Sequence, residues 1–446
     1  MVVAMFNPLH LENTDTSRFK RYREMLAFYS GEQWSGRKNR NEKRLTFNYA
    51  RVIVDKLTSY LMNGLSVRVT TDDESKRELA TQAESQLKHV HLANNLDLLD
   101  YETEVDTAIL GDGCYKVTWD KSRNRVKVSS PDIQGINVWW RGDDTTEIRQ
   151  VASSYKLDEQ EVRRLYPGVA FSKDPIFTEI WTEKRLEIWI GENKIVSRKN
   201  PYGFIPFVIF PNLRQAKSFW GVSDIEAIIE PQKELNRALS QLSHILELSG
   251  NPIAVLENVE RAEDIAVSPG AVWTLPEDAR AYLLDLLQGG GVDLHLGYIE
   301  MLYRVVHDTA ESPRAAFGGT ARDLSGVALE VELQPLLHKV WRKRLIRTAV
   351  YRKRAFMILE LLEKYTGKDY SGLSVEVDWR PVLPRDYSRT VEDEEKLVQS
   401  GIHSRKRAML DLGVDSPEVE FEEWLKERRA ILAMNKEMNS KEQRRS

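Results

Sequence analysis

The segments FIPFVIFPN at residues 204–212 and GVSDIEAIIEPQKELNRALS at residues 221–240 mark the point where strand-like sequence gives way to helical sequence. The apolar run from Ile205 to Phe210 is typical of a short buried strand. Pro231 then stands where the first turn of a helix tolerates the missing N–H. Leucines that recur at spacings of three and four predict one face of this helix: Leu235, Leu239, Leu242 and Leu246.

The chain before this point divides into a helical part and a strand-rich part. Apolar side chains recur at spacings of three and four from Phe19 to Tyr29 and predict a helix. A strict four-residue ladder from Tyr49 to Leu61 predicts a second helix, and residues 76–110 predict another long helical stretch. Residues 111–210 instead alternate between apolar and polar side chains. They predict eight or so short strands, interrupted by one helix at residues 158–166.

The chain after this point predicts two further helices separated by small units. Residues 253–290 predict a small mixed unit with strands at 253–256 and 271–275, closed by three glycines at 289–291. A second amphipathic helix follows, and the side chains that define its apolar side are Leu296, Ile299, Tyr303 and Val306.

The C-terminal part begins with a short polar segment. Residues 312–325, SPRAAFGGTARDLS, predict a loop, and residues 326–365 predict a very long helix that contains Pro335. Residues 374–379 alternate and predict a lone strand, which must pair with an earlier strand. The charged tail from residue 389 predicts further helices.

Composition excludes several classes of protein. The 446 residues suggest about three folding units. With 64 Lys and Arg against 68 Asp and Glu, the net charge of −4 excludes a protein that clamps nucleic acid through a large excess of positive charge. Cys114 is the only cysteine, so no intrachain disulfide forms. The sequence shows neither a leader nor a spanning helix, and we expect a protein assembled in the cytosol, without a membrane role.

Motifs for common enzyme chemistry are absent from the sequence. It has no phosphate-binding loop, no HExxH, no GxSxG and no GxGxxG. The acidic pairs Asp72-Asp73 and Asp143-Asp144 stand in turn-like contexts without a spaced third ligand, so backbone turns explain them better than a cation does. We therefore expect no catalytic residue, no metal site and no cofactor.

The stretch KVWRKRLIRTAVYRKR at residues 339–354 is the strongest local concentration of charge. On a helix Lys339, Lys343 and Arg347 share one face. This face is expected to be solvated or to contact acidic surfaces of neighbouring subunits. Contact with phosphates is the alternative.

Four ordered sets of segments together resemble the portal (connector) proteins of tailed bacteriophages, in the long-tailed siphophage branch. The first is FYSGEQW at 28–34 with FNYA at 47–50 and IVDKLTSYLMNG at 53–64, and the second is the pair of segments quoted first. The third is SGVALEVELQPL at 325–336. The fourth is VDWRPVLPRD at 377–386 with LVQSGIHSRKRAML at 397–410.

The resemblance implies an α+β portal fold, with a mainly helical wing, stem and crown, a strand-rich wing region and a small α/β clip. The implied parts are a wing at 1–230 with its strand-rich region at 111–210, stem helices at 231–249 and 292–311, a clip at 250–291, a tunnel loop at 312–325, a long wing helix with a returning strand at 326–388, and a crown with the C-terminal tail at 389–446.

The resemblance also implies a function and partners. Such proteins form a ring of twelve at one capsid vertex and pass double-stranded DNA during packaging and ejection. The implied partners are the terminase large subunit, the major capsid and scaffolding proteins, and a head-completion or adaptor protein. The implied location is the portal vertex of the virion, after assembly in the host cytoplasm. A different capsid or head-tail adaptor protein, or a DNA-processing enzyme, remains the alternative.

Within the implied tunnel loop, Arg314 and Arg322 are candidates for phosphate contact, and Asp323 would limit that contact. Gly318 and Gly319 would let the loop adjust as the duplex advances, and Thr320 is a further residue of the channel wall. A plain surface loop is the alternative. Sparse arginines suit a sliding polyanion, because each neutralised phosphate adds a salt-dependent binding contribution. The eight apolar side chains of the two stem helices are expected to pack against each other and against neighbouring copies.

Overall fold

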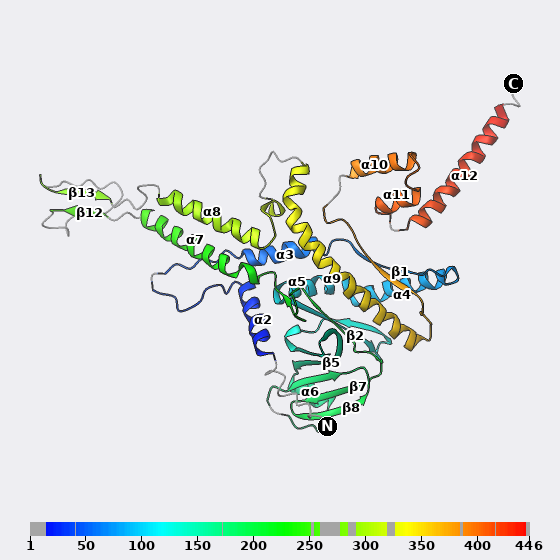
Figure 1. Cartoon of the computed structure of the whole chain (residues 1–446), viewed down its shortest axis with the longest axis horizontal. Helices are drawn as coiled ribbons and strands as arrows, with labels where there is room; N and C mark the ends of the chain where they lie inside the picture. The colour runs from blue at the N-terminus through cyan, green and yellow to red at the C-terminus, as the bar shows by residue number, and fades with distance from the viewer. Residues whose placement is uncertain are drawn as a thin grey trace. The chain divides into compact units, whose positions relative to one another are not determined.

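The computed structural model describes residues 15–40, 42–171, 173–250, 254–258, 277–283, 291–318, 326–383, 387–414 and 416–442. The chain divides into a first unit that ends at Trp379 and a second that begins at Arg380. The second unit holds α10 (Tyr387–Gln399), α11 (Arg405–Asp411) and α12 (Pro417–Glu442). The first unit combines helices with several antiparallel sheets (Figure 1), which confirms the predicted α+β class.

The N-terminal helices are α2 (Thr16–Tyr29) and α3 (Tyr49–Leu61), as the spacing predicts. The helical stretch predicted over residues 76–110 is confirmed, and it consists of two helices. The structure has α4 (Arg77–Asn94) and α5 (Leu96–Leu110), separated by Asn95 with φ of 50°. Asparagine tolerates this left-handed conformation better than most residues do, and one such residue interrupts a helix.

The strand-rich part contains the strands that the alternating sequence predicts, and in the structure they form two sheets. One has the order β3-β2-β9, with β2 (Asp112–Asp120), β3 (Arg125–Ser129) and β9 (Phe207–Pro211). The other has the order β4-β5-β6-β7-β8, from β4 (Ile136–Arg141) and β5 (Asp144–Lys156) through β6 (Ile176–Trp181) and β7 (Arg185–Ile190) to β8 (Asn193–Lys199). The predicted helix is α6 (Glu159–Leu165), capped by the side chain of Asp158.

Two long helices lie side by side in Figure 1: α7 (Ile229–Gly250) and α8 (Gly291–Thr309). A short 3₁₀ turn, η4 (Glu226–Ile228), precedes α7. Between the two helices, β12 (Ala254–Glu257) pairs with β13 (Arg280–Leu283). β12 overlaps the strand predicted at residues 253–256, whereas β13 was not predicted. The strand predicted at 271–275 lies outside the described residues.

The long predicted helix is α9 (Gly326–Thr366), which contains Pro335. A short 3₁₀ helix, η6 (Arg314–Phe317), comes before it in a segment predicted as plain loop. The lone predicted strand is β14 (Ser374–Trp379), and it pairs antiparallel with β1 (Leu65–Thr70). Its pairing with an earlier strand is therefore confirmed.

Two apolar clusters form the core of the first unit. One joins α2 and α3 to the start of α7 and the end of α8, through residues such as Tyr22, Ile53 and Val306. The other joins α4 and β2 to α9, through residues such as Leu87 and Tyr351. Among the described residues, no helix is both long and apolar enough to cross a membrane.

Candidate functional site: a buried charged junction and an exposed helical hairpin

The turn Gly221–Asp224 connects the strand-rich part to the long helices. It passes so close to the end of α5 that a Cβ on Gly221 would lie 2.4 Å from the carbonyl oxygen of Gly111. The backbone N–H of Gly221 donates to Asp112 Oδ1 at 2.7 Å, and the Tyr22 hydroxyl donates to the same carboxylate at 2.7 Å. Only glycine fits at residue 221, since backbone atoms occupy the space that a side chain would need.

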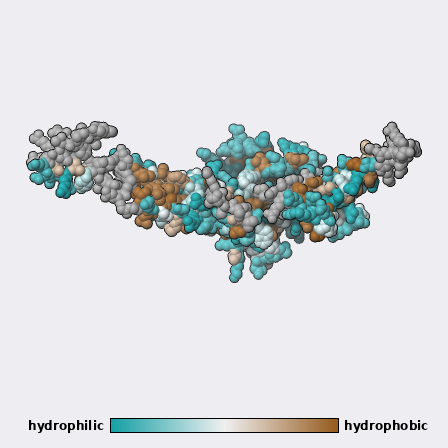
Figure 2. All heavy atoms as spheres, turned by 90° about the horizontal axis from the view of Figure 1, so that it is seen from above, coloured by the Kyte–Doolittle hydropathy of each residue, from teal (hydrophilic) through white to brown (hydrophobic). Residues whose placement is uncertain are grey.

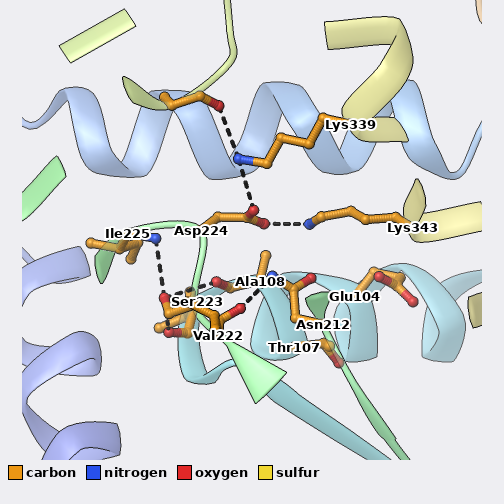
Figure 3. Close-up of polar contacts among 12 residues, drawn as sticks. Glu104, Thr107, Ala108, Asn212, Val222, Ser223, Asp224, Ile225, Lys339 and Lys343 are labelled. Atoms are coloured by element: carbon orange, nitrogen blue, oxygen red, sulfur yellow. Dashed lines mark hydrogen bonds and ion pairs between the residues drawn. The ribbon is translucent and has the colours of Figure 1, made fainter. Parts of the chain in front are cut away.

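Hydrogen bonds fix the rest of this turn to α5 (Figure 3). The Ser223 hydroxyl donates to the carbonyl of Ile109 at 2.6 Å, and the backbone N–H of Asp224 donates to the carbonyl of Ala108 at 2.9 Å. The Asn212 side chain donates to the carbonyl of Val222 at 3.0 Å. These bonds satisfy backbone groups that a buried segment would otherwise leave unpaired.

Asp224 is the centre of a buried ion cluster. Its carboxylate lies 2.9 Å from Lys339 Nζ and also binds Lys343, both from α9 (Figure 3). Lys339 donates as well to the carbonyl of Ala310, just beyond the last turn of α8, at 2.9 Å. This cluster therefore ties the turn, the end of α8 and the long helix α9 together.

Lys339 and Lys343 share the carboxylate of Asp224. In this cluster the pKa of Asp224 and the pKa of Lys343 are both lowered. Burial alone would raise the pKa of Asp224, but Lys339 and Lys343 outweigh it and hold that pKa well below its usual range. Burial, helped by Arg347 and Lys339, outweighs the attraction of Asp224 and lowers the pKa of Lys343 to about 8. The cluster therefore carries one positive charge in excess.

Two further ion pairs join α9 to α5. Arg347 binds Glu104 in a bidentate manner, at 2.6 and 2.8 Å, and donates to the carbonyl oxygens of Pro211 and Asn212. Arg354 binds both oxygens of Asp100. Burial opposes the charged form of Arg347, yet Glu104 outweighs it and raises the pKa of this guanidinium. Paired geometry of this kind is what makes a buried charge tolerable.

The prediction that the basic stretch 339–354 is solvated or contacts neighbouring subunits is wrong for its buried face. Lys339, Lys343 and Arg347 do share one face, but this face points into the subunit. Arg344 is buried too and donates to the carbonyls of Leu61 and Asn63 at the end of α3. A cation suits this position, because carbonyl groups at a helix C-terminus carry partial negative charge.

The eight predicted packing residues of α7 and α8 follow a gradient. Leu235 and Val306 are fully buried in the first core cluster, and Leu239, Ile299 and Tyr303 pack against it partly buried. Farther along the hairpin Leu242 is partly buried, whereas Leu246 and Leu296 are about half exposed, at 51% and 50%. The structure thus brings together the residues near the core and leaves the outer ones in water.

A second apolar stripe of α8 is exposed along its length, and the sequence analysis missed it. The stripe follows helical spacings of four, three and four residues, and its members are Leu294, Tyr298, Met301 and Val305. Leu294 is 76% exposed and Met301 51%. Figure 2 shows the hydrophobic surface gathered over this hairpin. The same spacings are present in the sequence, but the sequence prediction covers only the opposite apolar face of the helix.

The predicted tunnel-loop residues Arg314 and Gly318 lie in and just after η6. Arg314 is partly exposed, lies 3.7 Å from Glu300 and stacks over the ring of Tyr303. Gly318 ends η6 with φ of +82°, a conformation that favours glycine. The remaining candidates, Gly319, Thr320, Arg322 and Asp323, lie outside the described residues.

His307 anchors the start of this segment. Its Nδ1 lies 2.7 Å from the carbonyl of Ser312, and its ring meets those of Tyr49, Tyr303 and Phe317. Burial is the main cause that lowers the pKa of His307, so the neutral ring donates from Nδ1. Residues 312–317 are thus attached to the core.

Glu394, His403 and Asp411 in the second unit bring their ligand atoms within 4.8 Å of one another. His403 Nδ1 lies 2.9 Å from Glu394, and Asp411 accepts from Arg407 at 2.8 Å. Each side chain therefore has a partner inside the chain. The contact of His403 with Glu394 joins the segment before α11 to α10, and the pair of Arg407 with Asp411 lies within α11.

The comparison with known families decides the class of this protein. A protein-family model described as phage portal protein, SPP1 Gp6-like, matches residues 9–432. The chain belongs to this family of phage portal proteins. A search of curated proteins finds no match.

As a phage portal protein, the chain is a component of the virion capsid and has a structural role. Members of the family form oligomeric rings, with the capsid and the terminase as partners. In this portal protein the described residues provide a buried junction around Asp224 and a helical hairpin with exposed apolar side chains.

Proposed function

We propose that twelve copies of this portal protein close into a ring at one capsid vertex, and that double-stranded DNA passes through its channel during packaging and ejection. The wing is residues 1–230 with the long helix and strand of 326–388, and the crown is 389–446. The stem is residues 231–249 and 292–311, the clip is 250–291, and the tunnel loop is 312–325. The family match over residues 9–432 supports this assignment.

The exposed stripe of α8 carries the proposal. Leu294, Tyr298, Met301 and Val305 are between 38% and 76% exposed in the single chain. Covering such half-exposed side chains stabilises an assembly by about 1 kcal/mol each, and a closed ring repeats that contact in every copy. Contiguous apolar surface on a soluble chain marks a contact site. The neighbouring hairpin of a ring would supply the cover.

The proposed contact between the tunnel loop and DNA is weak, because the charges of the loop are partly balanced within the subunit. Arg314 has Glu300 within 3.7 Å, so part of its charge is balanced inside the subunit. Each phosphate that a lumen neutralises adds a salt-dependent contribution to binding, and a strongly basic lumen would hold DNA in place. Arg314 and Arg322 therefore guide the duplex, while Asp323 limits the attraction.

The proposed partners follow the parts of the ring. The clip contacts the terminase large subunit during packaging and the head-completion or adaptor protein afterwards. The major capsid and scaffolding proteins surround the wing, and assembly takes place in the host cytoplasm. The protein acts as a passive conduit rather than as an enzyme. An adaptor role is the second candidate, and it would not require the chain to pass DNA during packaging.

The test replaces one side chain of the exposed stripe by a charge. Met301→Glu places a carboxylate where a neighbouring hairpin would bury it, which costs several kcal/mol per contact. Gln241→Glu is the matched control, since residue 241 is exposed on α7. Native mass spectrometry and electron micrographs of the full chain measure the fraction in rings.

We expect rings for the wild type and for Gln241→Glu, and folded but unassembled chains for Met301→Glu. Rings at the wild-type fraction with Met301→Glu would reject the contact that the proposal assigns to this stripe. Absence of rings in the wild type under all assembly conditions would reject the ring itself.

A further inference from the structure

Helix α9 carries apolar side chains on its exposed side as well as on its buried side. Its inner face buries the cations of the junction, whereas its outer face exposes Val331 at 65%, Trp341 at 61%, Leu345 at 54% and Phe356 at 39%. Residues 341, 345, 349, 352 and 356 follow helical spacings of three and four, so they form one stripe, which we call the α9 outer face. An ordinary surface helix presents mainly polar and charged side chains to water.

The inner ion pairs prevent this helix from turning its apolar stripe inward. Arg347 and Arg354 hold Glu104 and Asp100 through two contacts each, and Lys339 and Lys343 hold Asp224. Rotation would leave these buried carboxylates unpaired, at a cost of several kcal/mol for each pair. The exposed stripe is therefore a fixed feature of the folded subunit.

The α9 outer face also carries a pocket with an unbalanced cation. The pocket measures ≈ 400 Å³, and its charged lining residues are Arg352, Lys353 and Glu360, beside apolar residues that include Phe204 and Phe356. Among the described residues, no acid pairs with Lys353, and partial burial lowers the pKa of its amine. From residue 333 to residue 359 the sequence contains no Asp or Glu. Two cations and one acid therefore line the pocket, which leaves one positive charge in excess.

Helix α5 has the complementary character. Leu98 is 51% exposed and Tyr101 37%, and the exposed acids Glu102 and Asp106 lie on the same side of the helix; these four residues are the α5 outer face. From residue 89 to residue 115 the sequence contains no Lys or Arg. Burial, with Asp132 and Glu102 nearby, raises the pKa of Asp106, because no cation among the described residues compensates its charge.

The two outer faces lie on opposite sides of the same pair of helices. α5 meets α9 through Asp100 and Glu104, and Leu98 and Glu102 lie on the other side of α5. A ring built from identical copies needs such a pair of different surfaces, one for each neighbour. With the two faces on opposite sides, the α9 outer face of each copy can contact the α5 outer face of the next copy around a ring.

We propose that the α9 outer face of one copy packs on the α5 outer face of the next copy in the ring, with Lys353 against Glu102 and Asp106. Trp341, Leu345 and Phe356 then cover Leu98 and Tyr101, and the pocket receives a side chain of the neighbour. This contact rests on the proposed ring, which it extends from the helical hairpin to the wing. Complementary charge sets the orientation of the two faces.

The first test exchanges the charges across the contact. Lys353→Glu alone and Glu102→Lys alone each place like charges opposite each other, whereas the double variant restores an opposite pair. Native mass spectrometry of the full chain measures the fraction in rings at one fixed concentration and salt. We expect each single change to lower that fraction by about threefold or more, and the double variant to recover most of it. Lys364→Glu, exposed near the end of α9, is the control that leaves the fraction unchanged.

The second test keeps the inference falsifiable if the charge variants fold poorly. Tyr101→Cys and Phe356→Cys are combined in one chain, where the native Cys114 is 1% exposed. Mild oxidation with copper phenanthroline then links neighbouring copies, and a ladder of covalent oligomers is expected. Phe356→Cys combined with Leu165→Cys, exposed on α6, is the control that gives no ladder.

The outcomes separate this contact from the ring itself. Rings that form without recovery in the double charge variant, and without the 101–356 ladder, would overturn the inference while leaving the ring in place. A ladder from the control pair alone would also overturn it, because the wing would then meet its neighbour through a different face. If no rings form at all, the proposed function fails instead.

Discussion

The junction around Asp224 buries charged side chains, whereas the outer part of the α7–α8 hairpin exposes apolar side chains. At the junction, charged side chains are buried, and the structure supplies the partners from the same chain: Lys339 and Lys343 for Asp224, and Arg347 for Glu104. On the hairpin, apolar side chains such as Leu294 and Met301 are exposed, and no described residue covers them.

The difference separates what one subunit completes alone from what requires neighbours. A buried charge without its partner costs several kcal/mol, so the junction must form when the subunit folds. An exposed apolar side chain costs far less free energy, so it can stay exposed in the folded subunit until assembly buries it. Changes at the junction are therefore expected to alter folding, whereas changes on the hairpin alter assembly.

The largest effect on folding is expected from Asp224→Asn. This change keeps the size of the side chain but leaves Lys339 and Lys343 buried without their anion, which costs roughly 3–5 kcal/mol of unfolding free energy. Urea titration of the full chain measures it, and Asp143→Asn on the exposed β4–β5 turn is the control. If the unfolding free energy falls by less than about 1 kcal/mol, the junction does not stabilise the folded subunit, and the distinction between folding at the junction and assembly at the hairpin is contradicted.

A smaller effect is expected from Lys343→Met. Asp224 keeps Lys339 at 2.9 Å, and the excess positive charge of the cluster disappears. The unfolding free energy is then expected to change by about 1 kcal/mol or less. A loss as large as that of Asp224→Asn would show that both lysines are required.

The pH dependence of the unfolding free energy gives a second test of the role of Lys343, again with Lys343→Met. The folded protein holds the pKa of Lys343 at about 8, below that of the unfolded chain. Between about pH 8 and 10 the unfolded chain therefore binds more protons, and the contribution of this lysine makes the unfolding free energy rise with pH. Lys343→Met is expected to lack this rise, and an unchanged slope would contradict it.

A still smaller effect is expected at His307, which anchors the segment after α8. Its pKa in the folded protein is lowered by burial, so below about pH 6.5 the unfolded chain takes up a proton that the folded chain resists. The unfolding free energy is expected to fall as the pH is lowered through this range, and less so in His307→Gln. His89→Gln, exposed on α4, should keep the wild-type profile. Identical profiles for all three proteins would contradict the assignment.

The smallest effect on folding and assembly is expected from Arg314→Ala combined with Arg322→Ala. The ion pair of Arg314 with Glu300 is at the surface and contributes between 0 and about 1 kcal/mol, so rings should form normally. The length of packaged DNA or its retention is expected to change, because the proposed phosphate contacts are lost. Arg185→Ala on β7 is the control. Unchanged packaging and retention in the double variant would remove the phosphate contacts.

Elements with a clear apolar period could be predicted from the sequence. The helices α2, α3 and α9 and the pairing of β14 with an earlier strand follow from spacings that are local in the chain. The break at Asn95 was missed, since a single left-handed residue interrupts a helix without disturbing the apolar pattern on either side.

The buried charges could not be predicted in the same way. The local sequence around Arg347 and Arg354 suggests a solvated face, while their partners Glu104 and Asp100 stand more than 240 residues earlier. Which distant acid meets which cation is a property of the tertiary fold. The one available sign was the long stretch without any acid, from residue 333 to 359, which must find its counter-charge elsewhere.

The most direct measurement of the distinction between folding and assembly is the rate at which a thiol reagent labels Met301→Cys. The native Cys114 is 1% exposed, and burial raises the pKa of its thiol, so it reacts slowly. Residue 301 is expected to react readily in the unassembled chain and at least tenfold more slowly in purified rings, where a neighbouring hairpin covers it. Equal labelling rates in rings and in unassembled chains would contradict the account.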